Sequence, residues 1–241
     1  MQKVKEIIQK QQAQSITPEQ TSTAIAKAQI SSSNETCSKC HDTGWILAGD
    51  GASQCECIAE QCVAKAFEDA PRYAHARLSD FDRKIVDAVL AALAKTKEGL
   101  FIVGPVGSGK THLAAAILRS RYEIGKSAKF VRAANLYRAI RESYQVGYIG
   151  LTEEQILNTY GTSEFLIIDD LAAGSLSDHE RRIALEVIDI RMNRLLQTVV
   201  TSNLLVEDIR KQMDERIASR LQSFIKIALT TTVDWRVRAK M

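Results

Sequence analysis

Residues 100–111 read LFIVGPVGSGKT. The four apolar residues are typical of a buried strand, the next eight fit G-x-x-x-x-G-K-T, and the HLAAAIL that follows favours a helix. In such a context, glycines let backbone N–H groups converge on phosphate oxygens, and the helix N-terminus adds a favourable field. We therefore expect a phosphate-binding loop made of Gly104, Pro105, Val106, Gly107, Ser108, Gly109, Lys110 and Thr111.

Two side chains of this loop are expected to contact ATP and its metal. Lys110 would reach the β- and γ-phosphates, and the Thr111 hydroxyl would bind Mg²⁺. The second half of the site is predicted in FLIIDD, residues 165–170, where an apolar strand ends in two acids. Asp169 would hold the magnesium, mostly through water, and Asp170 would orient the attacking water. A simple cap at the strand end is the alternative for Asp170.

Short apolar runs recur after residue 100, with helical stretches between them. This alternation is the signature of a parallel α/β sheet. Ser177 and Glu180 form a capping-box pattern before a helix expected to run to about Leu195, and Thr152 begins a shorter helix in the same way. Residues 63–98 also have a helical pattern. The expected strands are 100–103, 128–131, 165–168, 198–201 and 224–229.

Two further motifs point toward the terminal phosphate. VVTSN places Asn203 at the carboxyl end of a strand, the edge where ligands bind in such sheets, so Asn203 would position water. ERIASRL, residues 215–221, places Arg216 and Arg220 on one helix face, and a guanidinium suits a phosphate, including one bound to a neighbouring subunit. A turn asparagine and a solvated basic face are the alternatives.

All five cysteines lie within residues 37–62. A Cys-x2-Cys pair binds one zinc, and a second pair completes a tetrahedron. We expect zinc ligands at Cys37, Cys40, Cys55 and Cys57. Cys62 or, less favourably, His41 is an alternative for one position, because a Cys-x-Cys pair is tighter than the usual spacing.

The composition of the 241 residues, 45% hydrophobic and 25% charged, is that of a soluble globular protein. No run approaches 18 apolar residues and the N-terminus shows no secretory pattern, so we expect no membrane association. The net charge of +3 is too small to indicate nucleic-acid binding by itself. Cysteines without an export signal favour the reducing cytoplasm.

Taken together, these motifs resemble a known family. From about Leu78 to Arg236 the chain is similar to the AAA+ ATPase domain of DnaC/DnaI-type replicative helicase loaders, including phage and prophage versions. The resemblance rests on GPVGSGKTHLAAAI, LTEEQILNTYGTSEFLIIDDL, VVTSN and ERIASRL. It implies a parallel five-stranded P-loop sheet with ATP bound between subunits, and about 17 residues after Phe224 leave no room for a full lid domain.

The resemblance also assigns roles to individual residues. Asn203 would be sensor 1, Arg220 the finger that acts in a neighbouring subunit, and Arg236, in Asp-Trp-Arg, a sensor-2-like residue. The pattern CSKCHDTGWI…CEC is similar to a zinc module that precedes the ATPase domain in some loaders. The family commonly carries Glu where this chain has Asp170, and the shorter side chain implies slow hydrolysis.

In function, the resemblance implies ATP-dependent loading of a hexameric DnaB-type replicative helicase onto single-stranded DNA, with ATP-dependent self-association. The expected organisation is a polar N-terminal segment (1–36), a zinc-binding module that contacts the helicase (37–70) and the ATPase domain (71–241). An IstB-type transposition ATPase and an adaptor with little hydrolysis are the alternatives.

Residues 121–142 carry six basic residues against two acidic ones, with tyrosines nearby. Basic side chains with interleaved aromatic rings suit a single-stranded backbone and stacked bases. In the family that this chain resembles, the helices before the strand that ends in the two acids (FLIIDD here) bind single-stranded DNA. We therefore expect DNA contacts from Tyr137, Arg138, Arg141 and Tyr144. A solvated helix with its tyrosine in the core is the alternative.

Overall fold

The computed structural model describes residues 37–41, 43–48, 51–95, 99–172, 174 and 176–230. The chain divides into two units, Met1–Cys37 and Ser38–Met241, and the fold described below is that of the second. The expected polar segment at 1–36 and the predicted sensor-2-like residue Arg236 lie outside the described residues.

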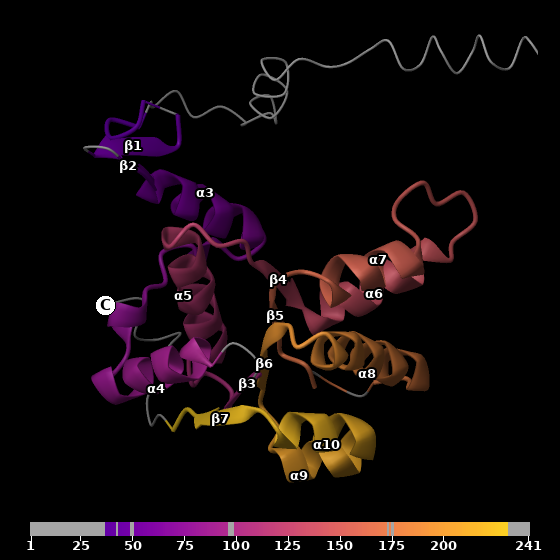
Figure 1. Cartoon of the computed structure of the whole chain (residues 1–241). Helices are drawn as coiled ribbons and strands as arrows, with labels where there is room; N and C mark the ends of the chain where they lie inside the picture. Colours follow the sequence, from indigo (N-terminus) through magenta and orange to yellow (C-terminus); the bar gives the residue numbers. More distant parts are fainter. Residues whose placement is uncertain are drawn as a thin grey trace, which may run out of the picture. The chain divides into compact units, whose positions relative to one another are not determined.

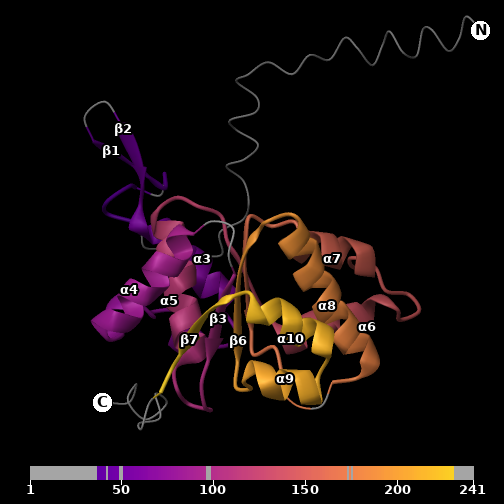
Figure 2. The same cartoon turned by 60° about the horizontal axis from the view of Figure 1, so that its bottom comes forward.

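A five-stranded parallel sheet forms the centre of the second unit (Figures 1 and 2). Its strand order is β4-β5-β6-β3-β7, and every neighbouring pair is parallel. This confirms the predicted fold class and all five predicted strands to within two residues at either end. The strands are β3 (Leu100–Val103), β4 (Lys129–Arg132), β5 (Phe165–Asp169), β6 (Gln197–Ser202) and β7 (Ile225–Ala228).

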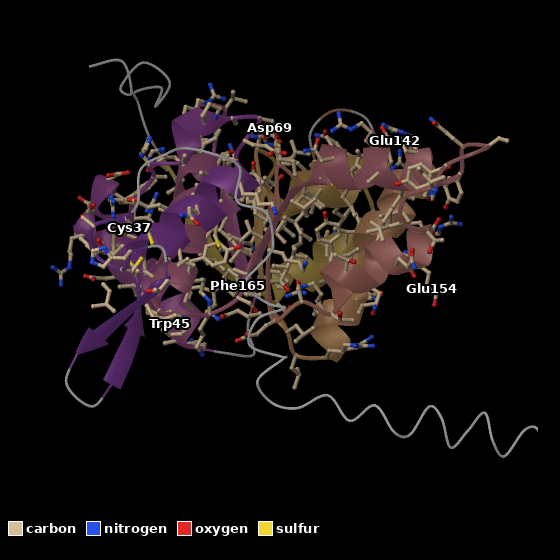
Figure 3. All side chains as sticks on the ribbon, turned by 90° about the horizontal axis from the view of Figure 1, so that it is seen from above. Cys37, Trp45, Asp69, Glu142, Glu154 and Phe165 are labelled. Atoms are coloured by element: carbon tan, nitrogen blue, oxygen red, sulfur yellow. The ribbon has the colours of Figure 1, made fainter. Side chains whose placement is uncertain are left out.

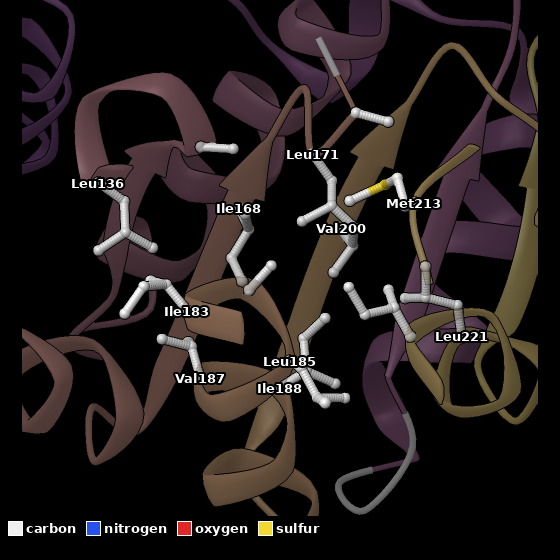
Figure 4. Packing of buried hydrophobic residues seen from close by; sticks show 14 of the residues in the cluster. Leu136, Ile168, Leu171, Ile183, Leu185, Val187, Ile188, Val200, Met213 and Leu221 are labelled. Atoms are coloured by element: carbon white, nitrogen blue, oxygen red, sulfur yellow. The ribbon is translucent and has the colours of Figure 1, made fainter. Parts of the chain in front are cut away.

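Alternate strand residues face opposite layers, because side chains of a strand point to its two faces in turn. In β3, Phe101 and Val103 belong to one hydrophobic cluster, and Leu100 and Ile102 belong to the other. Figure 4 shows part of the first cluster, with side chains of the strands and helices pointing into one space. The central strands are buried on both faces, which is why they read as continuous apolar runs.

Two groups of helices cover these two faces. The first cluster is closed by α6 (Ala133–Ser143), α7 (Glu153–Gly161), α8 (Asp178–Asn193), α9 (Val206–Gln212) and α10 (Glu215–Gln222). The second is closed by α3 (Glu56–Ala66), α4 (Arg83–Ala94) and α5 (Lys110–Glu123), with the short turns η2 (Pro71–Tyr73) and η3 (Leu78–Asp80).

Helix starts follow the predicted capping boxes. Ser177 and Thr152 each accept a hydrogen bond from the backbone N–H three residues on, and the side chains of Glu180 and Gln155 accept one in return. The end of α8 differs from the prediction: the helix stops at Asn193, and Leu195 has a left-handed φ of 54° and is 54% exposed. Leu195 therefore belongs to the turn that follows the helix.

The helical pattern of residues 63–98 is interrupted in the structure. One helix, α3, already ends at Ala66, and α4 begins at Arg83 after two short turns. Pro71 lacks a backbone N–H and begins η2, and the Asp82 side chain caps α4 by accepting from the N–H of Lys84. Local capping outweighs the helical propensity of this segment.

A buried arginine joins three of these elements. Arg191 of α8 has no exposed surface, and its guanidinium donates to Thr198 Oγ1 at 2.8 Å, to the Gln197 carbonyl at 2.7 Å, and to the carbonyls of Tyr160 and Ser163 at 2.7 and 2.8 Å. Burial lowers its pKa to about 10. Because these acceptors lie in β6, in the last turn of α7 and just after it, the arginine holds both elements against α8.

The helix α3 attaches the cysteine-rich region to the sheet. The hairpin of β1 (Trp45–Ala48) and β2 (Gly51–Gln54) is antiparallel and leads into α3, whose Val63 lies in the second hydrophobic cluster. Just after α3, the Phe67 ring packs on Phe130 of β4 with 4.3 Å between centroids. The helix thus shares a hydrophobic core with the five-stranded sheet.

Candidate nucleotide site and cysteine cluster

The phosphate-binding loop requires glycine at three places. Gly107 and Gly109 have φ values of 80° and 90°, a left-handed conformation that costs other residues about 1–2 kcal/mol. At Gly104, a Cβ would lie 2.5 Å from the Leu229 carbonyl oxygen and 2.8 Å from Ser108 Oγ. Gly109 also caps α5, so the loop runs directly into a helix N-terminus, as the sequence predicts.

Lys110 lies inside this loop. Its side chain is largely buried, and its ammonium donates to the carbonyls of Gly104 and Pro105, each at 2.9 Å. These contacts hold a positive charge beneath the loop backbone. Ser108 Oγ is buried without a hydrogen-bond partner among the described residues. The charge, the unused hydroxyl and the glycine cradle fit an anionic phosphate chain.

The structure brings the acidic strand next to the loop. The Thr111 hydroxyl lies 3.0 Å from Asp169 Oδ2, and Asp169, the last residue of β5, is 2% exposed. Burial raises the pKa of Asp169, and hydrogen bonds from Thr201 and Thr111 oppose that shift. A threonine hydroxyl beside a carboxylate is the oxygen donor set that Mg²⁺ prefers, so these residues fit the predicted metal role.

Sequence reasoning missed Thr201. This buried β6 residue donates from Oγ1 to Asp169 Oδ1 at 2.7 Å and accepts the backbone N–H of Asp170 at 2.8 Å. Asp170 is exposed and has a φ of 58°. Residues other than glycine adopt such a φ rarely, and it concentrates at functional sites. The available signal was a hydroxyl two residues before Asn203 at the end of a buried strand.

Asn203 follows β6 directly and is exposed. In the sheet, Ile168 pairs with Val200, so the ends of β5 and β6 lie side by side and Asn203 lies at the same edge as Asp169. The backbone N–H of Gly104 donates to the Ser202 carbonyl at 3.3 Å, which ties this strand end to the loop. The predicted groups therefore converge at one edge of the sheet.

A histidine–aspartate contact next to the loop was also missed. His112, which follows Thr111, has Nε2 2.7 Å from Asp80 Oδ2, and its ring lies 5.7 Å from that of Phe81. Residues of η3 are thereby held beside the start of α5. The signal in the sequence was weak, because the two residues are 32 positions apart.

The two arginines of α10 have different partners. Arg220 pairs with Asp189 of α8, whereas Arg216 pairs with Asp214, the residue that caps its own helix. Arg216 is the more exposed side chain, at 65% against 32% for Arg220. Both side chains are therefore at least partly exposed, and α10 packs in the first hydrophobic cluster, whereas α5, which follows the loop, packs in the second.

The predicted zinc ligands lie together. The sulfur atoms of Cys37, Cys40, Cys55 and Cys57 are all within 4.8 Å of one another, and Cys40 Sγ lies 3.4 Å from Cys57 Sγ. A tetrahedral zinc with bonds of 2.3 Å separates its sulfur ligands by about 3.8 Å, so the four residues fit this metal. Figure 3 labels Cys37, with yellow sulfur atoms beside it.

Backbone contacts shape this cluster. Cys55 precedes α3 and donates its N–H to the Gly44 carbonyl at 2.8 Å, and the Thr43 hydroxyl donates to the Cys40 carbonyl at 2.6 Å. Cys62 and His41 are not members of the cluster. Burial raises the pKa of the Cys62 thiol, which disfavours the thiolate that a metal needs.

The predicted DNA-contact residues of α6 divide between core and surface. Tyr137 is 3% exposed and lies in the first hydrophobic cluster, and burial raises its pKa. Its ring has no free face for a base, so the prediction for Tyr137 is wrong. Tyr137 is buried in α6 together with Leu136 and Ile140. The aromatic and basic residues of this helix therefore do not share one exposed face.

The other three residues are accessible. Arg138 is exposed, Arg141 pairs with Glu180, and Tyr144 is 56% exposed with its ring 5.6 Å from that of His179. The segment after α6 forms a loop that extends away from the neighbouring helices in Figure 1. Its exposed apolar residues are Val146, Tyr148, Ile149 and Leu151.

The sheet order, the loop after β3 and the acid that ends β5 define a P-loop ATP-binding domain of the AAA+ class. The family model for "IstB-like ATP binding protein" matches residues 56–229, and the chain belongs to this family. In the part of the chain that the structure describes, every helix is too short or too polar to cross a bilayer.

Two curated relatives illustrate the breadth of the family. The replicative helicase loader DnaC of Escherichia coli K12 is 30% identical over 119 residues, 49% of this chain and 48% of the relative. An ATP-binding protein of insertion sequence IS1162 from Pseudomonas fluorescens is 32% identical over 142 residues, 55% of this chain and 59% of the relative. The chain thus matches about half the length of these relatives.

Solved structures support the same fold. A crystal structure of the DnaC helicase loader superposes with a TM-score of 0.58 at 23% identity, over 67% of this chain and 100% of that one. A crystal structure of DnaI superposes with a TM-score of 0.55 at 24% identity, over 65% of this chain and 89% of that one. These likenesses establish the AAA+ fold that the motifs predict.

Proposed function

We propose that this protein is an ATP-dependent loader of a hexameric DnaB-type replicative helicase onto single-stranded DNA. The observation that carries the proposal is the four-cysteine cluster at the start of a helix packed on a DnaC-like ATP-binding domain. Such a cluster resembles the zinc module of some loaders. The proposed organisation is an N-terminal segment (1–36), a zinc-binding module that contacts the helicase (37–70) and the ATPase domain (71–241). The proposed location of the protein is the cytoplasm.

At the nucleotide site, the N–H groups of the glycine loop and the charge of Lys110 bind the phosphates. Thr111 and Asp169 hold Mg²⁺, which when bound offsets negative charge on the β- and γ-phosphates. Asp170 accepts a proton from the attacking water and aligns it, while Asn203 orients that water from the neighbouring strand. Support comes from their shared position at the carboxyl edge of the sheet.

The site is completed by arginines in this proposal. Arg220 contacts the terminal phosphate of ATP bound to a second copy, and Arg236 contacts the nucleotide from the C-terminal segment. The short Asp170 side chain makes hydrolysis slow, so that ATP acts mainly to gate assembly. In this proposal the protein self-associates when ATP binds, and the slower hydrolysis step then controls release of the helicase.

The DNA contact in this proposal uses Arg138, Arg141 and Tyr144, without Tyr137. The guanidinium groups neutralise phosphates and the exposed tyrosine ring stacks on a base. The supporting observation is that all three side chains are accessible on or just after one helix.

Light scattering after size-exclusion chromatography tests the helicase contact. The full chain is mixed with the replicative helicase of its host, with and without a non-hydrolysable ATP analogue. We expect one large complex, weakened by Trp45→Ala on the module, where the side chain is 55% exposed. Leu90→Ala, 47% exposed on α4, is the matched control. Absence of a complex with wild-type protein would overturn the proposal.

A transposition ATPase is the second candidate, favoured by the IstB-like family model and by the insertion-sequence relative. It predicts ATP-dependent assembly on duplex DNA and binding to a transposase. The same experiment with duplex DNA in place of the helicase distinguishes the two. An adaptor without catalysis predicts single-turnover hydrolysis no faster than in Lys110→Ala.

A further inference from the structure

The surface between α8 and α10 holds a two-point ion pair. The guanidinium of Arg220 donates from Nε to Asp189 Oδ1 and from Nη2 to Asp189 Oδ2, the latter at 3.1 Å. The two side chains are 32% and 34% exposed, so they are neither buried nor free in solvent. A bidentate contact of this kind fixes the plane of the guanidinium as well as its position.

The pair leaves part of the guanidinium available. Arg220 Nη1 also donates to the backbone carbonyl of Arg216, at 3.2 Å. A guanidinium has five N–H donors, and these three contacts leave two. The carboxylate therefore orients the guanidinium and leaves two of its donors for a phosphate.

The neighbouring arginine provides a contrast. Arg216 also makes a two-point pair, at 3.1 and 2.9 Å, but its partner Asp214 belongs to the start of the same helix. Asp214 further accepts the backbone N–H of Arg216 at 2.7 Å, which caps α10. Arg216 is thereby folded back onto its own helix end, whereas Arg220 is held from a second helix.

We propose that Asp189 is a positioning residue, which holds Arg220 so that its remaining N–H donors meet the terminal phosphate of ATP bound to a second copy. This inference rests on the proposed function. Holding a long side chain in one rotamer before the encounter removes an entropy cost from the reaction step. The positioned group stabilises charge that develops on the transferred phosphate.

Steady-state ATPase assays of the full chain test this role through Asp189→Ala. We expect kcat to fall about 10- to 100-fold, as for a misplaced catalytic group, with the KM for ATP nearly unchanged. The KM stays because each copy binds ATP through its own loop. Asp178→Ala is the matched control, since Asp178 pairs with Arg181 on the same helix and is 98% exposed.

Mixed assemblies separate positioning from misfolding. A Lys110→Ala copy lacks a working loop but keeps Arg220 positioned, whereas an Asp189→Ala copy keeps its loop. Mixing the two is expected to restore turnover at sites where an intact loop meets an intact arginine. If Asp189→Ala only destabilised the fold, its loop would also fail, and mixing it with Lys110→Ala copies would not restore ATP turnover.

The outcomes are distinct. Wild-type or raised kcat in Asp189→Ala, together with a large loss in Arg220→Ala, would overturn the positioning role and leave the proposed function standing. Wild-type kcat in Arg220→Ala would overturn the assignment of that arginine and the inference with it.

Discussion

The hydroxyl of Thr201 donates a hydrogen bond to the carboxylate of Asp169, with 2.7 Å between Oγ1 and Oδ1. The same oxygen accepts the backbone N–H of Asp170 at 2.8 Å. One buried side chain of β6 therefore orients the proposed metal ligand and the strained residue that follows it. The contact also joins β5 to β6 at the edge where the phosphate-binding loop lies.

Replacing this threonine tests its importance. Thr201→Val leaves the buried carboxylate and the Asp170 N–H without this partner, so we expect unfolding free energy to fall by about 1–3 kcal/mol. Magnesium-dependent binding of a fluorescent ATP analogue is expected to weaken, and binding in EDTA to change little. Thr201→Ser, which keeps the hydroxyl, is expected to restore both quantities.

The matched control for that variant is Thr198→Val. Thr198 is a buried threonine of the same strand whose Oγ1 accepts from Arg191 and does not contact Asp169. It is expected to lower stability without changing the magnesium dependence of nucleotide binding. Equal losses of nucleotide binding in the two variants would argue against a specific role for Thr201.

The glycines of the loop give a second prediction. Gly109→Ala places a Cβ at a φ of 90°, which costs about 1–2 kcal/mol and shifts the N–H groups that face the phosphates. We expect at least a tenfold loss of ATP affinity by titration calorimetry, about 1.4 kcal/mol.

Gly147→Ala is the control for backbone strain alone. Gly147 has a similar φ of 82°, but a Cβ there would meet nothing within 4 Å. A similar loss of stability with unchanged ATP affinity is expected. Unchanged affinity in Gly109→Ala would show that the loop does not hold the phosphates.

The cysteine cluster predicts one zinc per chain. Cys40→Ser removes a buried sulfur from the cluster, and we expect it to lose the metal measured by elemental analysis and to unfold at a lower temperature. Cys62→Ser is the control, because Cys62 is outside the cluster, and it is expected to retain the zinc. If Cys62→Ser lost the zinc while Cys40→Ser retained it, Cys62 and not Cys40 would be the zinc ligand.

The cap of α10 predicts a pH-dependent stability. The hydrogen bond from Arg216 lowers the pKa of Asp214, opposed by burial, so the folded state holds its charged form more strongly than the unfolded chain does. Its contribution is therefore complete above the ordinary aspartate pKa of about 3.9 and is lost as pH falls through the lowered folded value.

Urea unfolding of Asp214→Ala measures this contribution. At pH 7 we expect a loss of about 1 kcal/mol, typical of an N-cap. The difference from wild type is expected to shrink below pH 4. Asp87→Ala, in an exposed pair with Arg83, is expected to change stability by less than about 0.5 kcal/mol at either pH. A difference that grows at low pH would contradict the assignment.

Local sequence patterns predicted much of the fold. The two capping boxes and the five apolar runs depend on neighbours a few residues apart, and the structure has them where expected. The helical pattern of residues 63–98 is interrupted because Pro71 and the Asp82 cap are local signals that outweigh helical propensity.

The candidate sites were predicted unequally. The phosphate-binding loop and the cysteine cluster were recognisable because their residues recur at short, fixed spacings. Thr201 and the contact between Asp189 and Arg220 were not, since each joins positions 31 or 32 residues apart. Tyr137 was misassigned because composition does not say which side of a helix meets the sheet.

The sequence by itself determined the five strands, the two capping boxes, the phosphate-binding loop and the four cysteines, because each is encoded in residues that lie close together in the chain. Only the tertiary structure decided which hydroxyl orients Asp169, which acid holds Arg220, and that Tyr137 belongs to the core. These relationships arise when the sheet closes and helices pack on it. The contacts depend on the register between elements, which no single stretch of sequence contains.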